Sequence, residues 1–400
     1  MRIRAALLIL TLVLAGTVAG ERPVAGALPR AYNGLAATPP MGWNDYNAYG
    51  LEVTEALIER TADAMVANGM RDAGYAYVTI DDGWMAAGRD AAGNLRPDPA
   101  RFPHGIAAVA GYVHARGLKL GLYADAGLRT CGGLAGSLGH ERADAALFAA
   151  WGVDYLKYDN CYAGPGCDQV DCPGGRAAPA RERYAAMRDA LLATGRPIVF
   201  SLCAWGTEDV ARWGAGYGNL WRTTGDISPT YASMLSIFRQ TVGLDSRAGP
   251  GGWNDPDMLQ VGNGMTAVED RAELTLWAAL GAPLIAGTDL VRAGPDTLAL
   301  LTNRAVIAVD QDPLGRVARE VSAAGGRHVL ARPLSGGDVA VVLFNETGTT
   351  ATIGTTAEAV GASPGPHRLT DLWAGTSTTT GGDIEATVPP HGALLYRVAA

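Results

Sequence analysis

Several residue types and segments are scarce in this sequence, and each shortage excludes a class of function. Basic residues number 32 against 40 acidic ones, for a net charge of −8, and no basic run is interleaved with aromatic residues. A polyanion-binding surface is therefore not expected, and nucleic acid is not an expected partner. Only 6 histidines are scattered along 400 residues, so a histidine-based zinc site is not expected either.

The sequence also lacks an apolar run of about 20 residues, the length that crosses a bilayer. Its N-terminus instead has the charged segment Met1–Arg4 followed by the shorter apolar run Ala5–Ala15, which is typical of a secretory signal peptide rather than of an anchor helix. Cleavage could follow Gly20 or Ala27. We expect residues 1–27 to form the signal peptide and the mature protein to be secreted, without contact to a membrane. The bias toward Ala, Gly and Arg indicates a bacterial source.

Short apolar runs, rich in β-branched and aromatic residues, recur along the chain and end in polar or charged residues. Helical stretches separate them: after the first run, apolar residues recur at helical spacing from Leu57 to Met70, with Thr54 placed to cap the helix and Gly74 to end it. Repeated about eight times, this pattern predicts an α/β fold, a (β/α)8 TIM barrel over residues 38–316, with its chemistry at the strand C-termini. The predicted strands are Pro40–Asn44, Tyr75–Asp82, Leu118–Asp125, Val153–Asp159, Pro197–Cys203, Asn219–Arg222, Gly252–Asp255 and Pro283–Ala286.

The pattern changes near Gly315. Helical periodicity stops there, and Gly, Thr and Pro separate short alternating runs such as Val339–Asn345 and Ala393–Arg397. Residues 317–400 are therefore predicted to form a C-terminal antiparallel β-sandwich domain. Of two roles for this domain, sugar binding and packing against the barrel, we favour packing.

The five cysteines suit an exported protein, in which disulfides persist. Cys131 lies in the loop after the third predicted strand and Cys161 just past the fourth, so adjacent loops on one face of the barrel could join. Cys167 and Cys172, in a loop rich in Gly and Pro, are predicted to form a second, local bridge, which leaves Cys203 unpaired. We interpret Cys203 as a buried small apolar residue rather than a nucleophile.

Acids and tryptophans gather at the ends of the predicted strands. A cleft lined by carboxylates and aromatic rings suits a sugar, because carboxylates accept hydrogen bonds from hydroxyls and rings stack on C–H faces. A metal site is the alternative use of these acids, but glycoside hydrolysis requires no metal, and we expect neither a metal nor a cofactor. The acids are Asp81, Asp82, Asp125, Asp159, Asp226, Asp255 and Asp257, and the tryptophans are Trp43, Trp84, Trp205, Trp221 and Trp253.

Glycoside hydrolysis needs two carboxyl groups in different environments, one ionised to attack and one protonated to release the leaving group. Asp159 lies two residues after Lys157, whose ammonium is expected to lower the pKa of Asp159 and keep it ionised. Asp226 lies in a loop next to aromatic residues, where burial is expected to raise its pKa. Arg222 leaves a second interpretation open, an ion pair that holds Asp226 ionised.

Motifs spread over about 40–316 occur in a fixed order along the chain. They are Pro39–Asn44, Ile80–Met85, Gly121–Asp125 with Cys131, Leu156–Cys161, Ser201–Gly206, Trp221–Ile227 and Gly252–Leu259. Together they resemble the successive signatures of glycoside hydrolase family 27, the α-galactosidases or melibiases. That family also has a β-domain after its barrel.

The resemblance implies a retaining mechanism, with Asp159 as the nucleophile and Asp226 as the acid/base. It also implies that Asp81 and Asp82 hold the 6- and 4-hydroxyls of galactose. The full set of substrate-binding residues that it implies is Trp43, Asp81, Asp82, Tyr123, Cys131, Lys157, Cys203, Trp205, Arg222, Asp257 and Met258.

The resemblance further implies a bridge between Cys131 and Cys161. The sequence departs from the family at two places. Asp45–Asn47 stands where a small residue and a tryptophan commonly follow the asparagine, which could reshape the rim of the pocket. Ala204 stands where many relatives carry a glutamate.

The sequence as a whole predicts a secreted, exo-acting, retaining glycosidase that hydrolyses terminal α-D-galactosyl residues of oligosaccharides or polysaccharides through a covalent glycosyl-enzyme. Ala204 and Thr207 are both small, as are the matching residues in the N-acetylgalactosaminidase branch, so α-N-acetylgalactosaminidase is an alternative. β-L-arabinopyranosidase on the same scaffold is another. A non-catalytic sugar-binding protein is disfavoured because both Asp159 and Asp226 are kept, and a metal-dependent hydrolase would require activity that chelators abolish.

Overall fold

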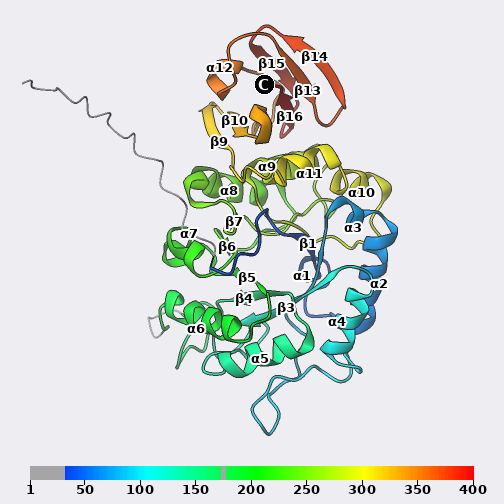
Figure 1. Cartoon of the computed structure of the whole chain (residues 1–400), viewed down its shortest axis with the longest axis vertical. Coiled ribbons are helices and arrows are strands. Elements are labelled where there is room, and N and C mark those ends of the chain that lie inside the picture. The colour runs from blue at the N-terminus through cyan, green and yellow to red at the C-terminus, as the bar shows by residue number, and fades with distance from the viewer. Residues whose placement is uncertain (1–31, 173–176) are drawn as a thin grey trace, which may run out of the picture.

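A curled sheet of parallel strands forms the body of the molecule (Figure 1). The computed structural model describes residues 32–172 and 177–400, so the predicted signal peptide and both cleavage sites lie outside the described residues. The strands are β1 Met41–Asn44, β2 Tyr77–Ile80, β3 Lys119–Asp125, β4 Tyr155–Asp159, β5 Val199–Leu202, β6 Leu220–Arg222, β7 Trp253–Asp255 and β8 Leu284–Ala286.

The eight strands follow the order β7-β6-β5-β4-β3-β2-β1-β8, and neighbouring strands run parallel. A parallel bridge between Leu259, just after β7, and Ala286 of β8 brings the two edges together. Each strand is followed by at least one helix, which covers the outside of the sheet (Figure 1). The predicted (β/α)8 barrel is confirmed.

The helices of the barrel begin where the sequence supplies caps. The Thr54 side chain accepts a hydrogen bond from the Leu57 amide at the start of α2, as predicted. The helix expected to run on to Gly74 is broken, however, because Gly69 adopts a left-handed φ of 83° and separates α2 from a short α3. The α-helices of the barrel are α1 Tyr46–Tyr49, α2 Glu55–Ala67, α3 Met70–Ala73, α4 Ile106–His114, α5 Glu141–Trp151, α6 Ala180–Ala193, α7 Val210–Trp213, α8 Tyr231–Thr241, α9 Ala267–Leu280, α10 Pro295–Leu301 and α11 Arg304–Asp310.

Short 3₁₀ segments complete the helical part of the barrel, at Thr207–Asp209, Gly214–Gly216 and Val242–Arg247. Helix α9 has both ends specified by sequence: Thr266 and Glu269 form a reciprocal capping box, and Gly281 ends the helix in the left-handed conformation. Across residues 32–172 and 177–400, no helix combines the length and the apolar character needed to cross a membrane.

The C-terminal part of the chain forms two antiparallel sheets that face each other. The larger has the order β14-β13-β16-β11-β10-β9, and the smaller pairs β12 with β15. Val341, Leu343, Ile353 and Ile384 belong to the apolar layer between them, so the predicted sandwich is confirmed. Its elements are β9 Arg319–Ala324, β10 Arg327–Pro333, a 3₁₀ turn at Ser335–Gly337, β11 Val339–Asn345, β12 Ala351–Thr356, α12 Ala357–Val360, β13 His367–Asp371, β14 Thr376–Thr380, β15 Asp383–Val388 and β16 Ala393–Val398.

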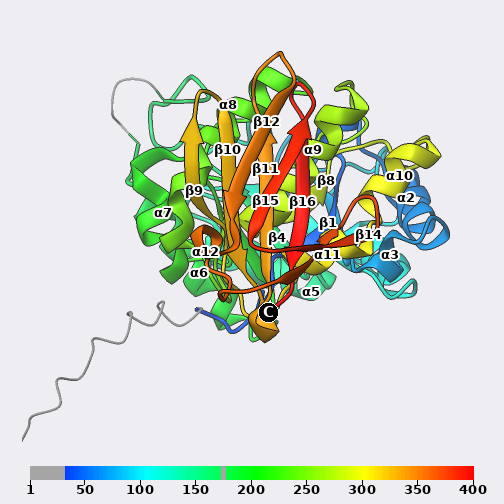
Figure 2. The same ribbon diagram turned by 90° about the horizontal axis from the view of Figure 1, so that it is seen from above.

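The larger sheet of the sandwich packs against α8 and α9 of the barrel (Figures 1 and 2). Phe238 of α8 meets the rings of His328 and Phe344 edge to face. Arg332 is fully buried, and its guanidinium donates to the carbonyl oxygens of Ala278 in α9 and of Asp310 in α11. The contact therefore combines aromatic packing with hydrogen bonds to carbonyls at the ends of two helices.

Candidate active site

Side chains from the carboxyl ends of the strands surround one small cavity of about 120 Å³. The acids and bases come from the ends of different strands, which is where a TIM barrel places its chemistry. A smaller hollow adjoins this cavity and shares Lys157, Arg222, Asp257 and Met258 with it. The cavity is lined by Tyr46, Asn47, Asp81, Asp82, Tyr123, Cys131, Lys157, Asp159, Arg222, Asp226, Ile227, Asp257 and Met258.

Three residues predicted for the site do not line this cavity. Cys203 lines the adjoining hollow. Trp43 is fully buried and donates from Nε1 to the carbonyl oxygen of Thr288 at 2.7 Å. Trp205, which has a left-handed φ of 55°, donates from Nε1 to Asp159 Oδ1 at 2.9 Å. Trp205 therefore touches the site through the Asp159 carboxylate.

The two acids that follow β2 are held by different partners. Asp81 Oδ2 accepts from Asn44 Nδ2 at 2.5 Å and from Lys157 Nζ at 2.7 Å. Asp82 Oδ2 accepts from the Gly132 amide at 2.7 Å. Burial raises the pKa of Asp82 to about 6, although the Gly132 hydrogen bond opposes the shift. Both carboxylates are thus fixed in orientation before a ligand binds.

Asp159 was expected to keep a low pKa beside Lys157, and this expectation is wrong. Burial raises the pKa of Asp159, because removing the carboxylate from water outweighs the attraction of the Lys157 ammonium. The negative charges of Asp81 and Asp226 raise it further. Lys157 itself is drawn to Asp81, whose charge raises the pKa of that ammonium against the opposing effect of burial.

The expectation that burial raises the pKa of Asp226 is also wrong. Desolvation does oppose its ionisation, but the positive charges of Arg222 and Lys157 outweigh it and lower the pKa of Asp226. The Asp226 side chain is 78% exposed, and Arg222 Nη2 lies 3.0 Å from its Oδ1. The alternative interpretation, an ion pair between Arg222 and Asp226, is confirmed.

Arg222 is shared between two carboxylates. Its buried guanidinium lies 3.1 Å from Asp257 Oδ2 as well as 3.0 Å from Asp226 Oδ1, and its Nη1 lies 3.7 Å from the Cys203 sulfur. Asp257 has a left-handed φ of 83°, and its Oδ2 accepts from the Ile227 amide at 2.8 Å. Burial raises the pKa of Asp257, and Arg222 opposes that shift.

The cysteines pair as predicted. Cys131 is bridged to Cys161, Cys167 is bridged to Cys172, and Cys203 is a buried free thiol. The loops after β3 and β4 approach so closely that a Cβ at Gly127 would lie 1.8 Å from the Cys161 carbonyl oxygen.

One group of acids and cysteines in the described residues is close enough to hold a metal ion, with ligand atoms within 4.8 Å of one another. It consists of Asp125, Asp159, Cys131 and Cys161. The two sulfurs are joined to each other, so they are not thiolate ligands. Asp125 is engaged as well, since its oxygens accept from the amides of Gly127 and Cys161.

Sequence reasoning missed several residues of the cavity. Tyr46, Asn47 and Ile227 line it, and the fully buried Asp45 supports it by accepting a hydrogen bond from the Asp81 amide at 2.7 Å. For Asp45, Tyr46 and Asn47 the sequence did hold a signal, because residues 45–47 are where the first motif departs from the family pattern. Ile227 follows Asp226 directly and carried no signal of its own.

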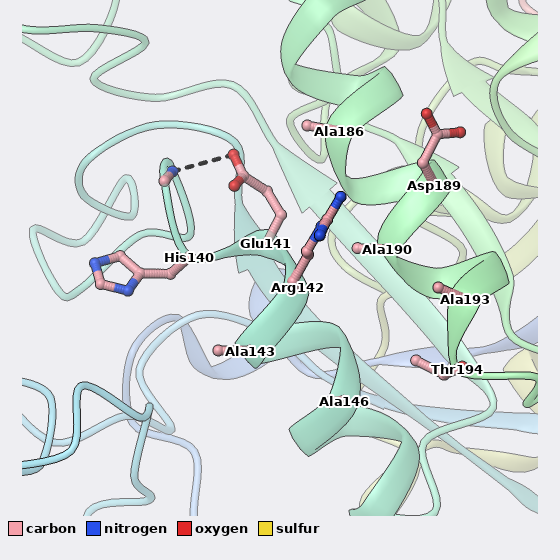
Figure 3. Close-up of a pocket in the computed structure, with 11 residues that line it drawn as sticks. His140, Glu141, Arg142, Ala143, Ala146, Ala186, Asp189, Ala190, Ala193 and Thr194 are labelled. Carbon is pink, nitrogen blue, oxygen red and sulfur yellow. Dashed lines mark hydrogen bonds between the residues drawn. The ribbon is translucent and has the colours of Figure 1, made fainter.

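A larger groove of about 800 Å³ lies elsewhere, between α5 and α6 (Figure 3). Five of the residues that line it are alanines, and the Glu141 carboxylate accepts a hydrogen bond from the Gly139 amide. None of the predicted site residues lines this groove. Although this groove is larger than the cavity at the strand ends, it is therefore not the candidate active site.

Known proteins resemble this chain over nearly all of its described length. The family model described as Alpha galactosidase A matches residues 38–312, and the one described as Alpha galactosidase C-terminal beta sandwich domain matches residues 324–398. An α-galactosidase of Cyamopsis tetragonoloba is 46% identical over 370 residues, which cover 92% of this chain and 87% of that protein.

Two solved structures extend the likeness to three dimensions. The α-galactosidase I of Mortierella vinacea has a TM-score of 0.87 and 36% identity, covering 92% of this chain and 98% of the other. The α-galactosidase of Saccharomyces cerevisiae, solved with raffinose, has a TM-score of 0.83 and 30% identity, covering 93% and 99%. Since family models match both the barrel and the sandwich, and a relative that covers 92% of this chain is 46% identical to it, this chain belongs to the α-galactosidase family of glycoside hydrolases.

Proposed function

We propose that this enzyme hydrolyses terminal α-D-galactosyl residues of oligosaccharides or polysaccharides with retention of configuration. The observation that carries the proposal is that Asp159 and Asp226 line the same small cavity as the Asp81 and Asp82 acid pair, in a chain of the α-galactosidase family. The yeast relative was solved with raffinose, an α-galactoside. The small volume of the cavity suits one terminal sugar at a time.

In the proposed mechanism Asp159 is the nucleophile. Its Oδ1 accepts from the Asn160 amide and from Trp205 Nε1, both at 2.9 Å, so Oδ2 is the oxygen that we assign to attack on the anomeric carbon. A bond forms between Oδ2 and that carbon while the bond to the leaving oxygen breaks. In the second step water attacks the same carbon and frees the carboxylate.

Asp226 is the proposed acid/base. It gives its proton to the leaving oxygen in the first step and takes one from the attacking water in the second. Arg222 favours the ionised form of Asp226, so the exposed Asp226 takes up a proton from solvent before the first step. The same guanidinium also contacts Asp257, so its charge stays balanced when Asp226 is protonated. Because the negative charge of Asp226 is one of the causes that raise the pKa of Asp159, protonation of Asp226 favours the ionised form of Asp159 that the first step needs.

The position of Ala204 supports galactose over N-acetylgalactosamine. Ala204 is fully buried and lines neither the cavity nor the adjoining hollow. Its carbonyl oxygen accepts from Thr207 Oγ1 at 2.6 Å. The small side chain at this position therefore adds no space to the cavity for an acetamido group, and a missing side chain supplies no affinity for one.

We also propose that the enzyme is exported. The support is the charged and apolar N-terminal pattern of residues 1–27, whose cleavage we place after Gly20 or Ala27. The bridges Cys131–Cys161 and Cys167–Cys172 suit an oxidising compartment.

Four nitrophenyl glycosides test the substrate: α-galactosyl, α-N-acetylgalactosaminyl, β-L-arabinopyranosyl and α-glucosyl. We expect the highest kcat/KM for the α-galactoside. NMR of the first-formed product should show α-galactose, because two inversions at the anomeric carbon retain configuration. A higher kcat/KM for another glycoside would overturn the proposed sugar, and β-galactose as the first product would overturn the covalent mechanism.

A further inference from the structure

The C-terminal domain contacts the beginnings of the two barrel helices that follow the active-site loops. The loop with Asp226 leads into α8, which begins at Tyr231, and the loop with Asp257 leads into α9, which begins at Ala267. In a (β/α)8 barrel the helix N-termini lie on the same face as the strand C-termini. An element that holds these two helix starts is therefore placed beside the catalytic loops.

His391 of the sandwich bridges both helix starts. Its ring stacks on Tyr231, the first residue of α8, with ring centroids 3.7 Å apart and planes inclined by 8°. Its Nδ1 lies 2.7 Å from Oε1 of Glu269, the residue of the first turn of α9 that forms the capping box. The Tyr231 hydroxyl also donates to the carbonyl oxygen of Glu346 in the sandwich, at 3.0 Å. One side chain of the C-terminal domain thus joins α8 to α9.

The turn that carries His391 is held in a costly conformation. His391 lies between β15 and β16 with a left-handed φ of 59°, which is unfavourable for a residue with a Cβ. Asn345 anchors the turn, because its Nδ2 donates to the carbonyl oxygens of Val388 and Pro389 and its amide donates to that of Gly392. Such a conformation persists where its surroundings enforce it.

The connection from Tyr231 back to Asp226 is short and tied down. Thr230 caps α8 through its side chain, and the Ser228 amide donates to Ser233 Oγ at 3.0 Å. The Ile227 amide donates to Asp257 Oδ2 at 2.8 Å. The Asp226 side chain is exposed and its carboxylate contacts Arg222 at 3.0 Å, so the course of this loop sets whether that contact is kept. A shift at the start of α8 is therefore transmitted to Asp226.

We propose that His391 is a positioning residue for Asp226, through which the C-terminal domain fixes the start of α8 and the loop that presents the proton donor. This inference rests on the proposed role of Asp226 as the acid/base. It assigns the sandwich a part in catalysis that requires no contact between that domain and the sugar.

The test compares two substrates that differ in their need for a proton donor, raffinose and 2,4-dinitrophenyl α-galactoside. His391→Asn removes the stack but keeps a residue that tolerates the left-handed conformation. We expect kcat for raffinose to fall about tenfold, part of the ~10²–10⁴ that general acid catalysis contributes, and kcat for the aryl galactoside to change less than about twofold. Tyr231→Phe keeps the stack and should keep the wild-type ratio of the two rates.

Trp373→Phe is the matched control for a loosened domain contact. Trp373 Nε1 donates to Thr275 Oγ1 of α9 at 2.9 Å, so this variant also removes a hydrogen bond between the domains. It should leave the ratio of the two rates unchanged. If it altered that ratio as much as His391→Asn does, the specific role of His391 would be overturned.

The double variant with Asp226→Asn separates this inference from the proposed function. If His391 acts through Asp226, adding His391→Asn to Asp226→Asn should not change the ratio of the two rates further. Should His391→Asn slow both substrates equally, or neither, while Asp226→Asn slows mainly raffinose, the positioning role is wrong. Should Asp226→Asn itself slow both equally, the assignment of the acid/base is wrong instead. A thermal denaturation curve for each variant serves as the control that the variant is folded.

Discussion

Lys157 on β4 reaches across β3 and donates a hydrogen bond to Asp81, the first residue after β2, at 2.7 Å. This pairing gives the cationic partner to an acid of the proposed sugar pocket rather than to Asp159, two residues further along β4. Burial then dominates at Asp159 and raises its pKa. Variants of Lys157 therefore test the ion pair with Asp81, and variants of Asp159 test the proposed nucleophile.

Lys157→Met should weaken both stability and sugar binding. The Asp81 side chain is 2% exposed, and removing one partner of a buried ion pair costs about 3–5 kcal/mol, because the other charge is left uncompensated. Urea denaturation measures the loss, and KM for the nitrophenyl α-galactoside should rise. Lys119→Met, at the exposed start of β3, is the control and should change stability by no more than about 0.5 kcal/mol. Equal losses in the two variants would contradict the Lys157–Asp81 pairing.

Asp159→Asn should abolish turnover while raising thermal stability at neutral pH. The folded state raises the pKa of Asp159 above its ordinary 3.8. Its ionised form therefore destabilises the fold once the pH exceeds the unfolded pKa of about 3.9. The neutral amide removes that cost.

The gain in Tm from Asp159→Asn should be present at pH 7 and vanish below about pH 4, where the carboxyl is protonated in both states. Scanning calorimetry at the two pH values measures it. Azide should restore some turnover to Asp159→Gly by replacing the lost nucleophile. Near-normal activity without azide in either variant would contradict the assignment.

In Asp226→Asn acting on the activated aryl galactoside, where no titration of Asp226 overlaps that of Asp159, the acid limb of the pH profile should lie above the ordinary carboxyl range. As the pH falls through the raised pKa of Asp159, the proposed nucleophile becomes protonated and kcat/KM declines. Measurement of kcat/KM from about pH 3 to pH 9 gives the midpoint. A midpoint at or below the ordinary value of 3.8 would show that burial does not govern Asp159 in the free enzyme.

Asp226→Asn should slow raffinose by about 10²–10⁴ and an activated aryl galactoside far less, since only a poor leaving group needs protonation. The pH profile should also change shape, because Asp226, whose pKa Arg222 and Lys157 lower, no longer titrates. Steady-state kinetics on both substrates measure these effects. A profile that keeps its shape would make Asp226 a residue that only positions the sugar.

Loss of the Cys131–Cys161 bridge should impair galactose binding as well as stability. The residue after Cys131, Gly132, donates its amide to Asp82 Oδ2 at 2.7 Å, so a loosened loop releases this carboxylate. KM should rise in the double variant Cys131→Ser, Cys161→Ser, and Tm should fall. The double variant Cys167→Ser, Cys172→Ser is the control, since neither residue lines the cavity; an equal rise in KM there would contradict the coupling.

The barrel and most of its site could be predicted from the sequence, because strand ends in this fold meet at one face. Asp81, Asp159 and Arg222 each lie at or just after the end of a strand, so the predicted strands were sufficient to place these three residues at the same face of the barrel. Loop residues that enter the cavity from outside this pattern, such as Ile227, were missed. The break at Gly69 was missed as well, because the apolar spacing continues on both sides of it.

The pKa shifts of the carboxyl groups in the site could not be predicted from the residues that lie near them in the sequence. Lys157 and Asp159 are two residues apart on a strand, which places both on one side of the sheet, and proximity suggested an ion pair. The partner that Lys157 takes lies 76 positions away. Asp226 shows the converse, since the charges of Arg222, four residues earlier, and of Lys157 together outweigh the burial that was expected to raise its pKa.

The buried Arg332 makes the sandwich inseparable from the barrel. Its guanidinium is enclosed by carbonyl oxygens at the ends of α9 and α11, and pulling the domains apart would leave those oxygens without their donor and open the apolar surface around Phe238. Recombination could therefore not replace the sandwich with an unrelated domain without exposing these groups of the barrel. A shortened gene ending after the barrel would encode a chain with an uncovered apolar flank, prone to aggregate in the cell.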